Sequence, residues 1–373
     1  MNSISMMAGT HRLGRVFLSF SGCVGIEGNS LMDQPFRPLS VEQARYAVES
    51  GQQYDGWLQA GERVRKFAGT VGWKTVRGRR YLVRVLDRKG SQTSLGPESP
   101  ETEALFRAFL ADKQEAVMRL KHAEARLAEL ARMNVALRLG RVPRLAAWLL
   151  NALAQKRLLG KVVHVVGTHA LYAYEAMAGA FLSPGLLETS DLDFMVDPRR
   201  IKLGVEGVPT TRLIDVLKDI DPSFVREEKA YSVRNKDGFE VDLIKAASRD
   251  PLRRAALVAQ GDIEPVEIMN LKWLLNAPKI SAVAIGQDGY PVPMSVPDPR
   301  AFALYKFYLA NEPARDPRKR IRDEAQARAL VALIEERLPA YPFDPEQLRM
   351  FPTLLRHGVQ TSRNPFFSGG GEE

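Results

Sequence analysis

The sequence contains little of what disulfides and zinc sites are made from. Its 373 residues include one cysteine, Cys23, and five histidines. A single cysteine excludes an intrachain disulfide, and the chain fits a reducing compartment, which we expect to be the cytoplasm. No cysteine or further histidine stands at zinc-ligand spacing around His164 and His169, so neither histidine suggests a metal site.

Long apolar runs are also missing. No stretch approaches the roughly 18 to 20 consecutive apolar residues of a membrane-spanning helix, so we expect no membrane partner. The run VFLSFSGCVGI after Arg15 has the outline of a signal sequence, but its apolar core is short and interrupted by serines and glycines. We therefore expect residues 1–31 to be a disordered extension and the Gly-rich residues 365–373 to be a disordered tail.

Acidic residues are scarce in the first part of the chain. Residues 1–161 hold 26 Lys and Arg against 14 Asp and Glu, a net charge of +12, whereas residues 162–373 hold 27 against 30, a net charge of −3. A basic region joined to a nearly neutral one favours a polyanionic partner such as RNA, although a basic face can also serve solubility alone.

The elements that are present predict an α+β (mixed) fold. An apolar fraction of 45 % supports ordinary cores, and the length allows two or three domains. We expect a small mixed sheet with flanking helices. The predicted division is a basic helical region with a β-hairpin at 32–160, a catalytic domain at 161–290 and a helical C-terminal domain at 291–364.

Periodicity and capping signals locate the elements of the basic region and of the C-terminal part. Helices are expected at 41–67, where Ser40 is the N-cap, and at 101–132, 143–156, 300–311 and 317–338. Residues 91–100 are expected to be a polar loop. Residues 291–299 carry four prolines and are expected to be a connector.

Two strands at 73–76 and 80–86 flank Arg77-Gly78-Arg79, which is a hairpin signal. Basic side chains alternate there with Trp73 and Tyr81, an arrangement that strands use to bind single-stranded nucleic acid. Basic hairpins are also common as surface decoration. The candidate nucleic-acid-binding residues are Lys74, Arg77, Arg79, Arg80 and Arg84.

A buried strand at Val162–Val166 ends at Gly167-Thr168, where a helix is expected to begin. Glycine lets the backbone approach a ligand closely, and a helix N-terminus offers free N–H groups and a positive dipole end. The Thr168 hydroxyl adds a donor. Together these features suit a phosphate group. A Gly-Thr after a strand is, however, often only a turn.

Three aspartates are predicted to meet at one edge of the sheet. Asp191 and Asp193 flank Leu192 on a strand, so both carboxylates emerge on one face. Asp242 lies on a later apolar strand and would add a third carboxylate. Oxygen ligands without cysteine or histidine indicate Mg²⁺ rather than zinc.

These residues, in this order, resemble the nucleotidyltransferase superfamily typified by DNA polymerase beta, whose pattern is apolar-Gly-Gly/Ser, acidic-x-acidic, then a lone acidic residue. The resemblance spans residues 162–246. The wording GTHALYAYEAMAG…TSDLDFMVD also resembles a bacterial branch of nucleotidyltransferase-like proteins. Thr168 replaces the commoner Ser or Gly. The 24 positions from Gly167 to Asp191 imply an insertion at 179–190 that leaves the strand register intact.

The resemblance implies transfer of a nucleoside monophosphate from an NTP to an acceptor hydroxyl, with two Mg²⁺ ions, or Mn²⁺, about 3.5 to 4 Å apart. Asp191 and Asp193 would bridge both ions, and Asp242 would complete one of them. Gly167 and Thr168 would hold the phosphates. Pyrophosphate would leave.

A lysine in the C-terminal part resembles one that serves the nucleotide phosphates in the abortive-infection type of nucleotidyltransferase. Lys306 lies in VPDPRAFALYKFYLA and is followed by a basic helix with Lys319, Arg320 and Asp323. Lys306 could equally be a lysine that extends its charge from an amphipathic helix to solvent.

Three functions follow as expectations. The first is nucleotidyl transfer onto RNA such as tRNA, ahead of protein or a small molecule as acceptor. The second is a metal-dependent glycosyltransferase with a DxD motif, which would release a nucleoside diphosphate. The third is a protein without catalysis, such as an RNA-binding or toxin-antitoxin component, although such a protein usually loses a carboxylate from the site.

Overall fold

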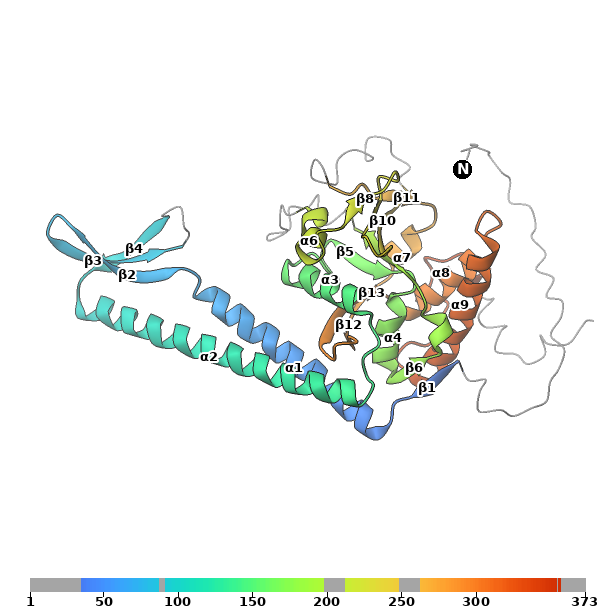
Figure 1. Ribbon diagram of the computed structural model, residues 1–373, viewed down its shortest axis with the longest axis horizontal. Coiled ribbons are helices and arrows are strands. Elements are labelled where there is room, and N and C mark those ends of the chain that lie inside the picture. The colour runs from blue at the N-terminus through green and yellow to red at the C-terminus, as the bar shows by residue number, and fades with distance from the viewer. Residues whose placement is uncertain (1–34, 87–90, 198–211, 248–261, 354, 357–373) are drawn as a thin grey trace, which may run out of the picture.

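The computed structural model describes residues 35–86, 91–197, 212–247, 262–353 and 355–356. The expected extension at 1–31 and the expected tail at 365–373 lie outside these residues. The described chain forms a body around a mixed sheet and a long arm that projects from it and ends in a small sheet (Figure 1). This combination confirms the predicted α+β class.

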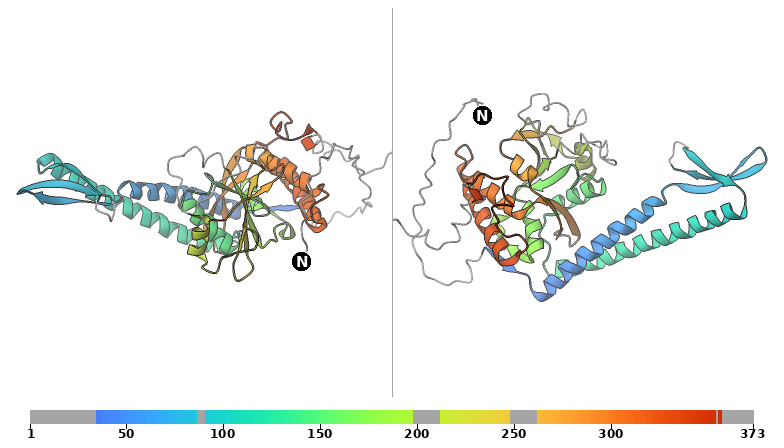
Figure 2. Two further views of the ribbon diagram at one scale, coloured as in Figure 1. Left: turned by 90° about the horizontal axis from the view of Figure 1, so that it is seen from above. Right: turned by 180° about the vertical axis from the view of Figure 1, so that it is seen from behind.

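The arm consists of two long helices, α1 (Val41–Lys66) and α2 (Pro100–Ala136), which lie side by side along most of its length (Figures 1 and 2). Both predicted helices are therefore confirmed. Each begins at a capping box, in which the N-cap side chain accepts from the backbone N–H three residues later and the side chain of that residue accepts from the N-cap N–H. The Ser40 hydroxyl accepts from the Gln43 N–H at 3.2 Å, and Ser99 forms the same motif with Thr102.

The contact between α1 and α2 is made largely by small and polar side chains. The buried positions of α2 recur at steps of seven, four and three, the spacing of a coiled coil. Large aliphatic residues are few among them. The buried residues are Gln43, Ser50 and Tyr54 on α1, and Thr102, Ala116, Ala123, Leu127, Leu130, Ala131 and Asn134 on α2.

The arm ends in a three-stranded antiparallel sheet, which we call the tip sheet. It contains β2 (Thr70–Val76), β3 (Arg79–Val85) and β4 (Gln92–Pro97) in this order. The hairpin is confirmed, but the polar loop predicted at 91–100 is wrong, because most of it is β4. Its exposed polar residues pair through the backbone with the free edge of β3, and that pairing needs no apolar pattern.

The sheet of the body has the strand order β5-β7-β10-β9-β8, with β11 also paired to β10. β5 runs antiparallel to β7, and β7 runs parallel to β10. The bounds are β5 Val163–Val166, β7 Asp191–Val196, β8 Val225–Arg226, β9 Ser232–Arg234, β10 Glu240–Ala246 and β11 Val266–Ile268.

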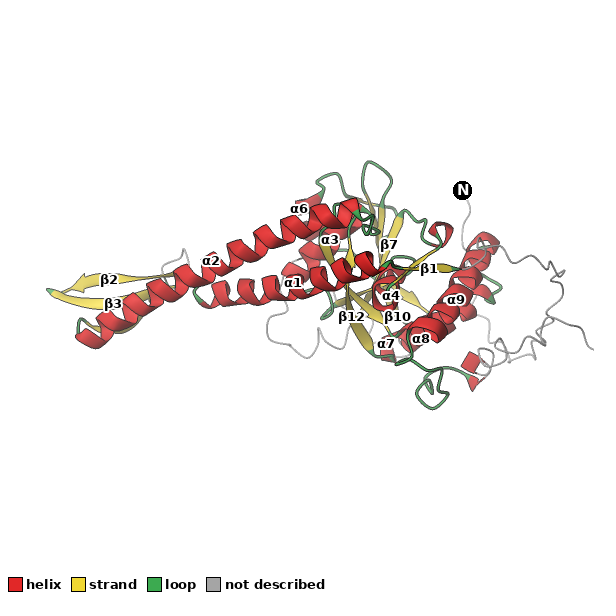
Figure 3. Ribbon diagram, turned by 90° about the horizontal axis from the view of Figure 1, so that it is seen from below, coloured by secondary structure: helices red, strands yellow, loops and turns green. Residues whose placement is uncertain are grey.

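The sheet is held by a core of large apolar side chains. Leu192 and Phe194, on the face of β7 opposite to its aspartates, are fully buried. Figure 3 shows α3, α4, α8 and α9 beside the sheet. The helices that lie around the sheet contribute residues to the same core. They are α3 Arg144–Gln155, α4 Ala170–Ala178, α6 Leu213–Ile220, α7 Lys272–Asn276, α8 Pro299–Ala310 and α9 Pro317–Arg337. No helix in the described ranges is long and apolar enough to span a bilayer.

The connector predicted at 291–299 is wrong. Most of this segment is strand β13 (Pro291–Pro297), which pairs antiparallel with β12 (Lys279–Ile285) over the whole length of both strands. The predicted domain division at 290/291 therefore falls between two paired strands. Likewise α3, predicted to belong to the basic region, packs on β13 and α6 inside the core of the body.

The prolines of β13 fit this ladder because of their spacing. At one end of the ladder the Asp298 N–H donates to the Pro278 carbonyl at 2.9 Å, so the even-numbered N–H groups of β13 point toward β12. The odd-numbered groups point away, where a missing donor removes no bond of the ladder. Pro291, Pro293 and Pro297 all occupy odd positions.

The insertion at 179–190 leaves the register of β5 and β7 intact, as expected. It contains β6 (Ala180–Leu182) and a 3₁₀ turn, η1 (Pro184–Leu186). β6 pairs antiparallel with β1 (Phe36–Pro38), which immediately precedes the arm. The insertion thereby attaches the beginning of the described chain to the body.

Candidate active site

The three predicted aspartates lie together on one face of the central strands. Asp193 of β7 is paired directly with Asp242 of β10, and Asp191 is paired with Glu240. Residues paired across parallel strands project to the same side of the sheet, and so do residues two apart on one strand. Asp191, Asp193, Glu240 and Asp242 therefore share one face, and all four are partly buried. We call the part of this face formed by the three aspartates the aspartate edge.

Gly167 packs directly against one of these carboxylates. It follows β5 with a φ of +64°, in the left-handed region that favours glycine. A Cβ atom at this position would lie 1.9 Å from Asp193 Oδ2. The backbone of Gly167 is therefore in contact with the Asp193 side chain, and a residue with a Cβ atom does not fit at position 167.

The electrostatics of the edge reflect several negative charges at close range. Burial, and then the charges of Asp191 and Asp242, raise the pKa of Asp193 to about 7, against the opposing charges of Lys306 and Lys319. The pKa of Asp242 is also raised, chiefly by burial, although a hydrogen bond from Ser232 lowers it. Carboxylates that repel one another in this way are stabilised by a cation between them.

One carboxylate oxygen at this edge is buried without a partner. Asp242 Oδ1 accepts no hydrogen bond from any described residue. A buried acceptor of this kind normally has a partner, and at a carboxylate a metal ion can serve as one. The Asp242 side chain is thus available to a ligand at the edge that it shares with Asp193.

Oxygen donors alone fit a hard divalent cation, but the side chains do not close around one point. Within the described ranges no group of three or more His, Cys, Asp or Glu residues is placed to hold a metal ion. Asp191 accepts a hydrogen bond from the Thr189 hydroxyl, and Asp242 is bonded by Ser232. Ligation by all three aspartates would therefore require side-chain movement.

Thr168 follows the glycine and is almost fully buried. Its hydroxyl is 3.3 Å from Gln326 Nε2, which donates to it and also to the Leu186 carbonyl at 2.6 Å. The sequence reasoning missed Gln326. Its position three residues after Asp323 places both side chains on one face of α9 and could have indicated it.

Lys306 belongs to a buried ion-pair cluster and does not reach into solvent. Its Nζ atom donates to Asp323 Oδ1 at 2.7 Å, and Asp323 also accepts from Arg315. Lys306 and Asp323 are 4 % and 0 % exposed, which excludes a solvent-directed lysine. Burial lowers the pKa of Lys306, whereas the charges of Asp323 and Asp193 raise it. Lys306 therefore lies within electrostatic range of the aspartate edge.

The histidines near the glycine are both buried. His164 Nδ1 lies 2.9 Å from Ser295 Oγ in the core. His169 packs against Tyr172 and Phe239. Burial lowers the pKa of His169 to about 4, against the charge of Asp191. The His169 imidazole is therefore uncharged at neutral pH.

Glu175 is 3 % exposed and has a structural role. It accepts from Arg141 at 3.0 Å and from the Leu182 N–H at 2.7 Å. This buried pair connects α4 to β6 and to the chain that enters α3. Burial raises the pKa of Glu175, and Arg141 opposes the shift.

The predicted nucleic-acid-binding residues are not at this edge. Lys74, Arg77, Arg79, Arg80 and Arg84 all lie in the tip sheet at the far end of the arm (Figure 1). The structure thus brings together the aspartates, Gly167, Thr168 and Lys306, and separates them from the basic residues.

Comparison with known families identifies the family of the chain. A family model described as nucleotidyltransferase matches residues 144–350, more than half of the chain. The chain belongs to the nucleotidyltransferase family. Nucleotidyltransferases transfer phosphorus-containing groups from an NTP to an acceptor and generally use divalent metal ions. The match includes every residue of the edge and excludes the arm. No curated protein and no solved structure matches the chain.

Proposed function

We propose that this nucleotidyltransferase transfers a nucleoside monophosphate from an NTP to a hydroxyl group on RNA, with Mg²⁺ as cofactor, and releases pyrophosphate. The observation that carries the proposal is the pairing of Asp193 with Asp242 across β7 and β10, with Gly167 packed on Asp193. This juxtaposition brings acids 49 positions apart in the sequence to one face of the sheet, beside the Gly167-Thr168 turn.

Asp191, Asp193 and Asp242 would hold the metal. When bound, a pair of divalent ions polarises the α-phosphate, lowers the pKa of the acceptor hydroxyl and neutralises the leaving pyrophosphate. Mn²⁺ has the same preference for oxygen ligands and can replace Mg²⁺. Asp242, whose Oδ1 lacks a described partner, would accept the proton of the attacking hydroxyl.

The phosphates would be held beside the aspartates. The backbone at Gly167 and Thr168 offers N–H groups at the start of α4. The Thr168 hydroxyl, bonded by Gln326, fixes the conformation of this turn. Lys306 and Lys319 both lower the pKa of Asp193, so their charges act at its carboxylate. There they would stabilise the triphosphate, and Asp323 would keep Lys306 oriented.

RNA is the proposed acceptor, ahead of a protein or a small molecule, because the basic surplus of the chain lies in residues 1–161, most of which precede the matched region. The proposed location is the cytoplasm, where RNA, NTPs and a chain without disulfides are compatible. Membership of a toxin-antitoxin pair would be consistent with modification of RNA such as tRNA.

The test is transfer of label from each α-labelled NTP to total cellular RNA or protein in the presence of Mg²⁺. We expect labelled RNA with the wild-type protein and no label with Asp191→Ala/Asp193→Ala. Asp237→Ala is the matched control, because Asp237 is an exposed aspartate in the turn before β10, and it should label normally. Circular dichroism checks that each variant is folded.

The products distinguish the competing functions. Pyrophosphate release supports nucleotidyl transfer, whereas release of a nucleoside diphosphate with a sugar nucleotide would indicate a glycosyltransferase. Label on protein would correct the acceptor but keep the chemistry. Equal labelling by the wild type and the double variant would refute the assignment of the aspartates.

A further inference from the structure

The two faces of the tip sheet differ in their surroundings. Residues paired across antiparallel strands share a face, so Trp73, Leu82 and Arg84 lie on the same side. This side packs on α2. The Trp73 ring lies 6.0 Å from that of Phe106, and the Leu82 side chain is fully buried.

The opposite side, which we call the outer face, carries Lys74, Arg79 and Tyr81. Lys74 is paired with Tyr81, and Val76 is paired with Arg79. Lys74, Val76 and Arg79 are exposed, and Tyr81 is partly exposed. The outer face thus presents one aromatic ring between two cations.

The charge of the tip sheet is of one sign. Among the described residues 70–86 and 91–97 there are five Lys and Arg and no Asp or Glu. Arg80 forms an ion pair with Glu98 and lies over the Trp73 ring. Arg84 donates to the Lys66 and Ala68 carbonyls. These two arginines therefore serve the arm itself.

The remaining cations are available to an external anion. Arg77, in the β2–β3 turn, and Arg79 form no ion pair with any described residue, and Lys74 contacts only the neutral Gln92 amide oxygen at 3.3 Å. A stacking surface flanked by cations suits nucleic acid, because bases stack on the ring while phosphates meet the charges. An acidic protein would satisfy the charges but would leave the ring without a specific role.

The distance of the outer face from the aspartate edge restricts the size of the acceptor. α2 has 37 residues, which corresponds to a length of about 55 Å. The tip sheet lies at the end of the arm away from the body in every view (Figures 1 and 2). A molecule that is bound at the tip while it reacts in the body must therefore extend over tens of ångströms.

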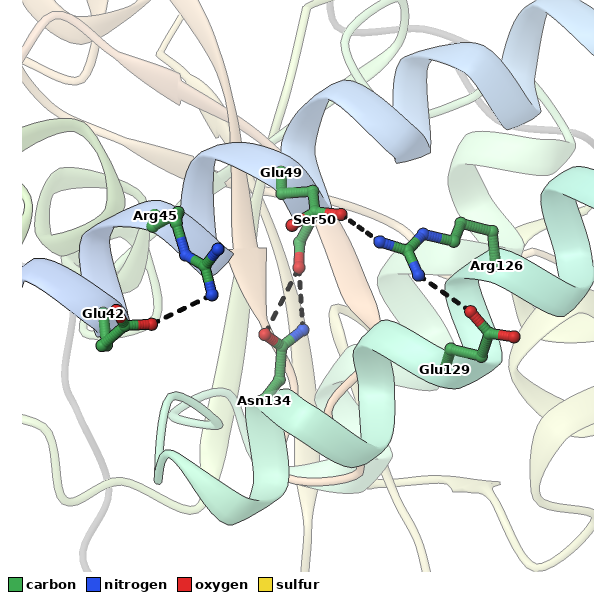
Figure 4. Close-up of polar contacts among 7 residues, drawn as sticks. All are labelled: Glu42, Arg45, Glu49, Ser50, Arg126, Glu129 and Asn134. Carbon is green, nitrogen blue, oxygen red and sulfur yellow. Dashed lines mark hydrogen bonds and ion pairs between the residues drawn. The ribbon is translucent and has the colours of Figure 1, made fainter.

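The base of the arm is fixed to the body, which makes this distance definite. Asn134 of α2 donates to Ser50 of α1 at 2.9 Å and to the Gly289 carbonyl of the body at 2.8 Å. Figure 4 shows Asn134 facing Ser50, with Arg126 bridging Glu49 and Glu129 beside them. The polar cluster thus joins both helices and the body at one place.

We propose that the outer face of the tip sheet binds a single-stranded part of the acceptor nucleic acid, through Lys74, Arg79 and Tyr81 with Arg77 at its margin. The arm then selects acceptors that are long enough to reach from the tip sheet to the aspartate edge. This inference rests on the proposed function for the identity of the reaction, but the binding surface stands on its own geometry.

The test compares full-length variants in binding to a fluorescent single-stranded RNA. The outer-face variant is Lys74→Ala/Arg79→Ala/Tyr81→Ala. The matched control, Lys121→Ala/Arg132→Ala/Tyr46→Ala, removes the same residue types from the shaft of the arm. We expect binding to weaken at least about tenfold in the outer-face variant only. The slope of log Kd against log salt should fall by about one to two, because two phosphate contacts are lost.

A second measurement separates this inference from the proposed function. The outer-face variant should transfer label to a short oligonucleotide, which cannot reach the tip sheet, as well as the wild type does. Its transfer to long RNA should fall. Loss of RNA binding with no transfer by any protein would confirm the surface and refute the proposed chemistry.

Two results would overturn the inference. One is equal RNA affinity and equal salt slope for the outer-face variant and the shaft control. The other is an acidic protein that competes with RNA for the outer face and binds it more tightly. Tyr81→Trp provides the conservative control, because it keeps an aromatic surface and should retain binding. Thermal melts establish that every variant is folded.

Discussion

The body and the arm are held together by different kinds of side chain. The body encloses large apolar side chains such as Leu192, Phe194 and Phe302, each at most 1 % exposed. The contact between the arm helices depends instead on small or polar residues such as Ser50, Ala116 and Ala123. A dense core fixes side chains to within fractions of an ångström, which the aspartate edge requires. An arm that provides reach requires only a fixed length and a fixed base.

The comparison predicts that chemistry can be removed without affecting the arm. Asp193→Asn removes a charge and a proposed metal ligand, so we expect nucleotidyl transfer to fall by about 10³-fold or more, the equivalent of several kcal/mol. Binding of RNA should not change. Single-turnover transfer and RNA titration on the same preparation measure both. A parallel loss of RNA binding would show that the two regions are not separate.

A smaller change in the body should act through geometry alone. Gly167→Ala places a Cβ atom against Asp193 at a position with a φ of +64°. We expect a roughly 10²-fold loss of transfer from misplacement of the carboxylate. Gly185→Ala is the control, because a Cβ atom there meets no atom within 4 Å. Equal activity of the two variants would contradict the close packing of Gly167 on Asp193.

A change at the base of the arm should loosen the arm and leave the chemistry of the body unchanged. Asn134→Ala removes the hydrogen bonds to Ser50 and Gly289 and leaves a buried carbonyl unpaired, which costs about 1–3 kcal/mol. Hydrogen exchange should rise in α1 and α2 but not in β7 and β10. Gln114→Ala, an exposed position on α2, should leave exchange unchanged. Transfer to a short acceptor should be normal in both.

The smallest expected effect is on the stability of the body against pH. Asp193 has a folded-state pKa near 7, above the ordinary value, so the folded state binds its proton more tightly than the unfolded state does. Without metal, stability should therefore decrease as pH rises from about 4 to about 7. Asp193→Asn should remove this decrease and raise Tm at pH 8 by a few degrees.

Divalent metal should remove the stability advantage of Asp193→Asn over the wild type at pH 8. Saturating Mg²⁺ should raise the Tm of the wild type and lower the apparent pKa of Asp193, with little effect on Asp193→Asn. Melting curves from pH 4 to pH 8, with Mg²⁺ or with a chelator, measure both effects. A wild type that is as stable as the variant at pH 8 without metal would contradict the repulsion among the aspartates.

Much of the body could be predicted from the sequence because its strands are short apolar runs that end at chemically distinctive residues. Gly167, Asp191, Asp193 and Asp242 each stand at such a strand, and the structure places them on one edge. Two of the strands that could not be predicted illustrate different reasons. β4 is polar and exposed, and β13 contains prolines, whose acceptability depends on which way their missing N–H groups would point.

Contacts between distant parts of the chain could not be predicted. Gln326 meets Thr168, and Asn134 meets Gly289, across more than a hundred residues in each case. The face of the tip sheet on which each basic residue lies also depends on register. From the sequence alone, Arg80 and Arg84 are as good candidates for nucleic-acid binding as Lys74 and Arg79. The strand pairing places Arg80 and Arg84 on one face of the tip sheet and Lys74 and Arg79 on the other.

The most direct test of the account is the number of divalent ions bound in the presence of a non-hydrolysable NTP. Mn²⁺ titration followed by electron paramagnetic resonance can be applied to the wild type, Asp193→Asn, Asp242→Asn and the control Asp237→Ala. We predict that the wild type and the control bind Mn²⁺ with the nucleotide, and that each edge variant loses at least one ion. Equal Mn²⁺ binding by all four proteins would contradict a metal site formed by the paired aspartates.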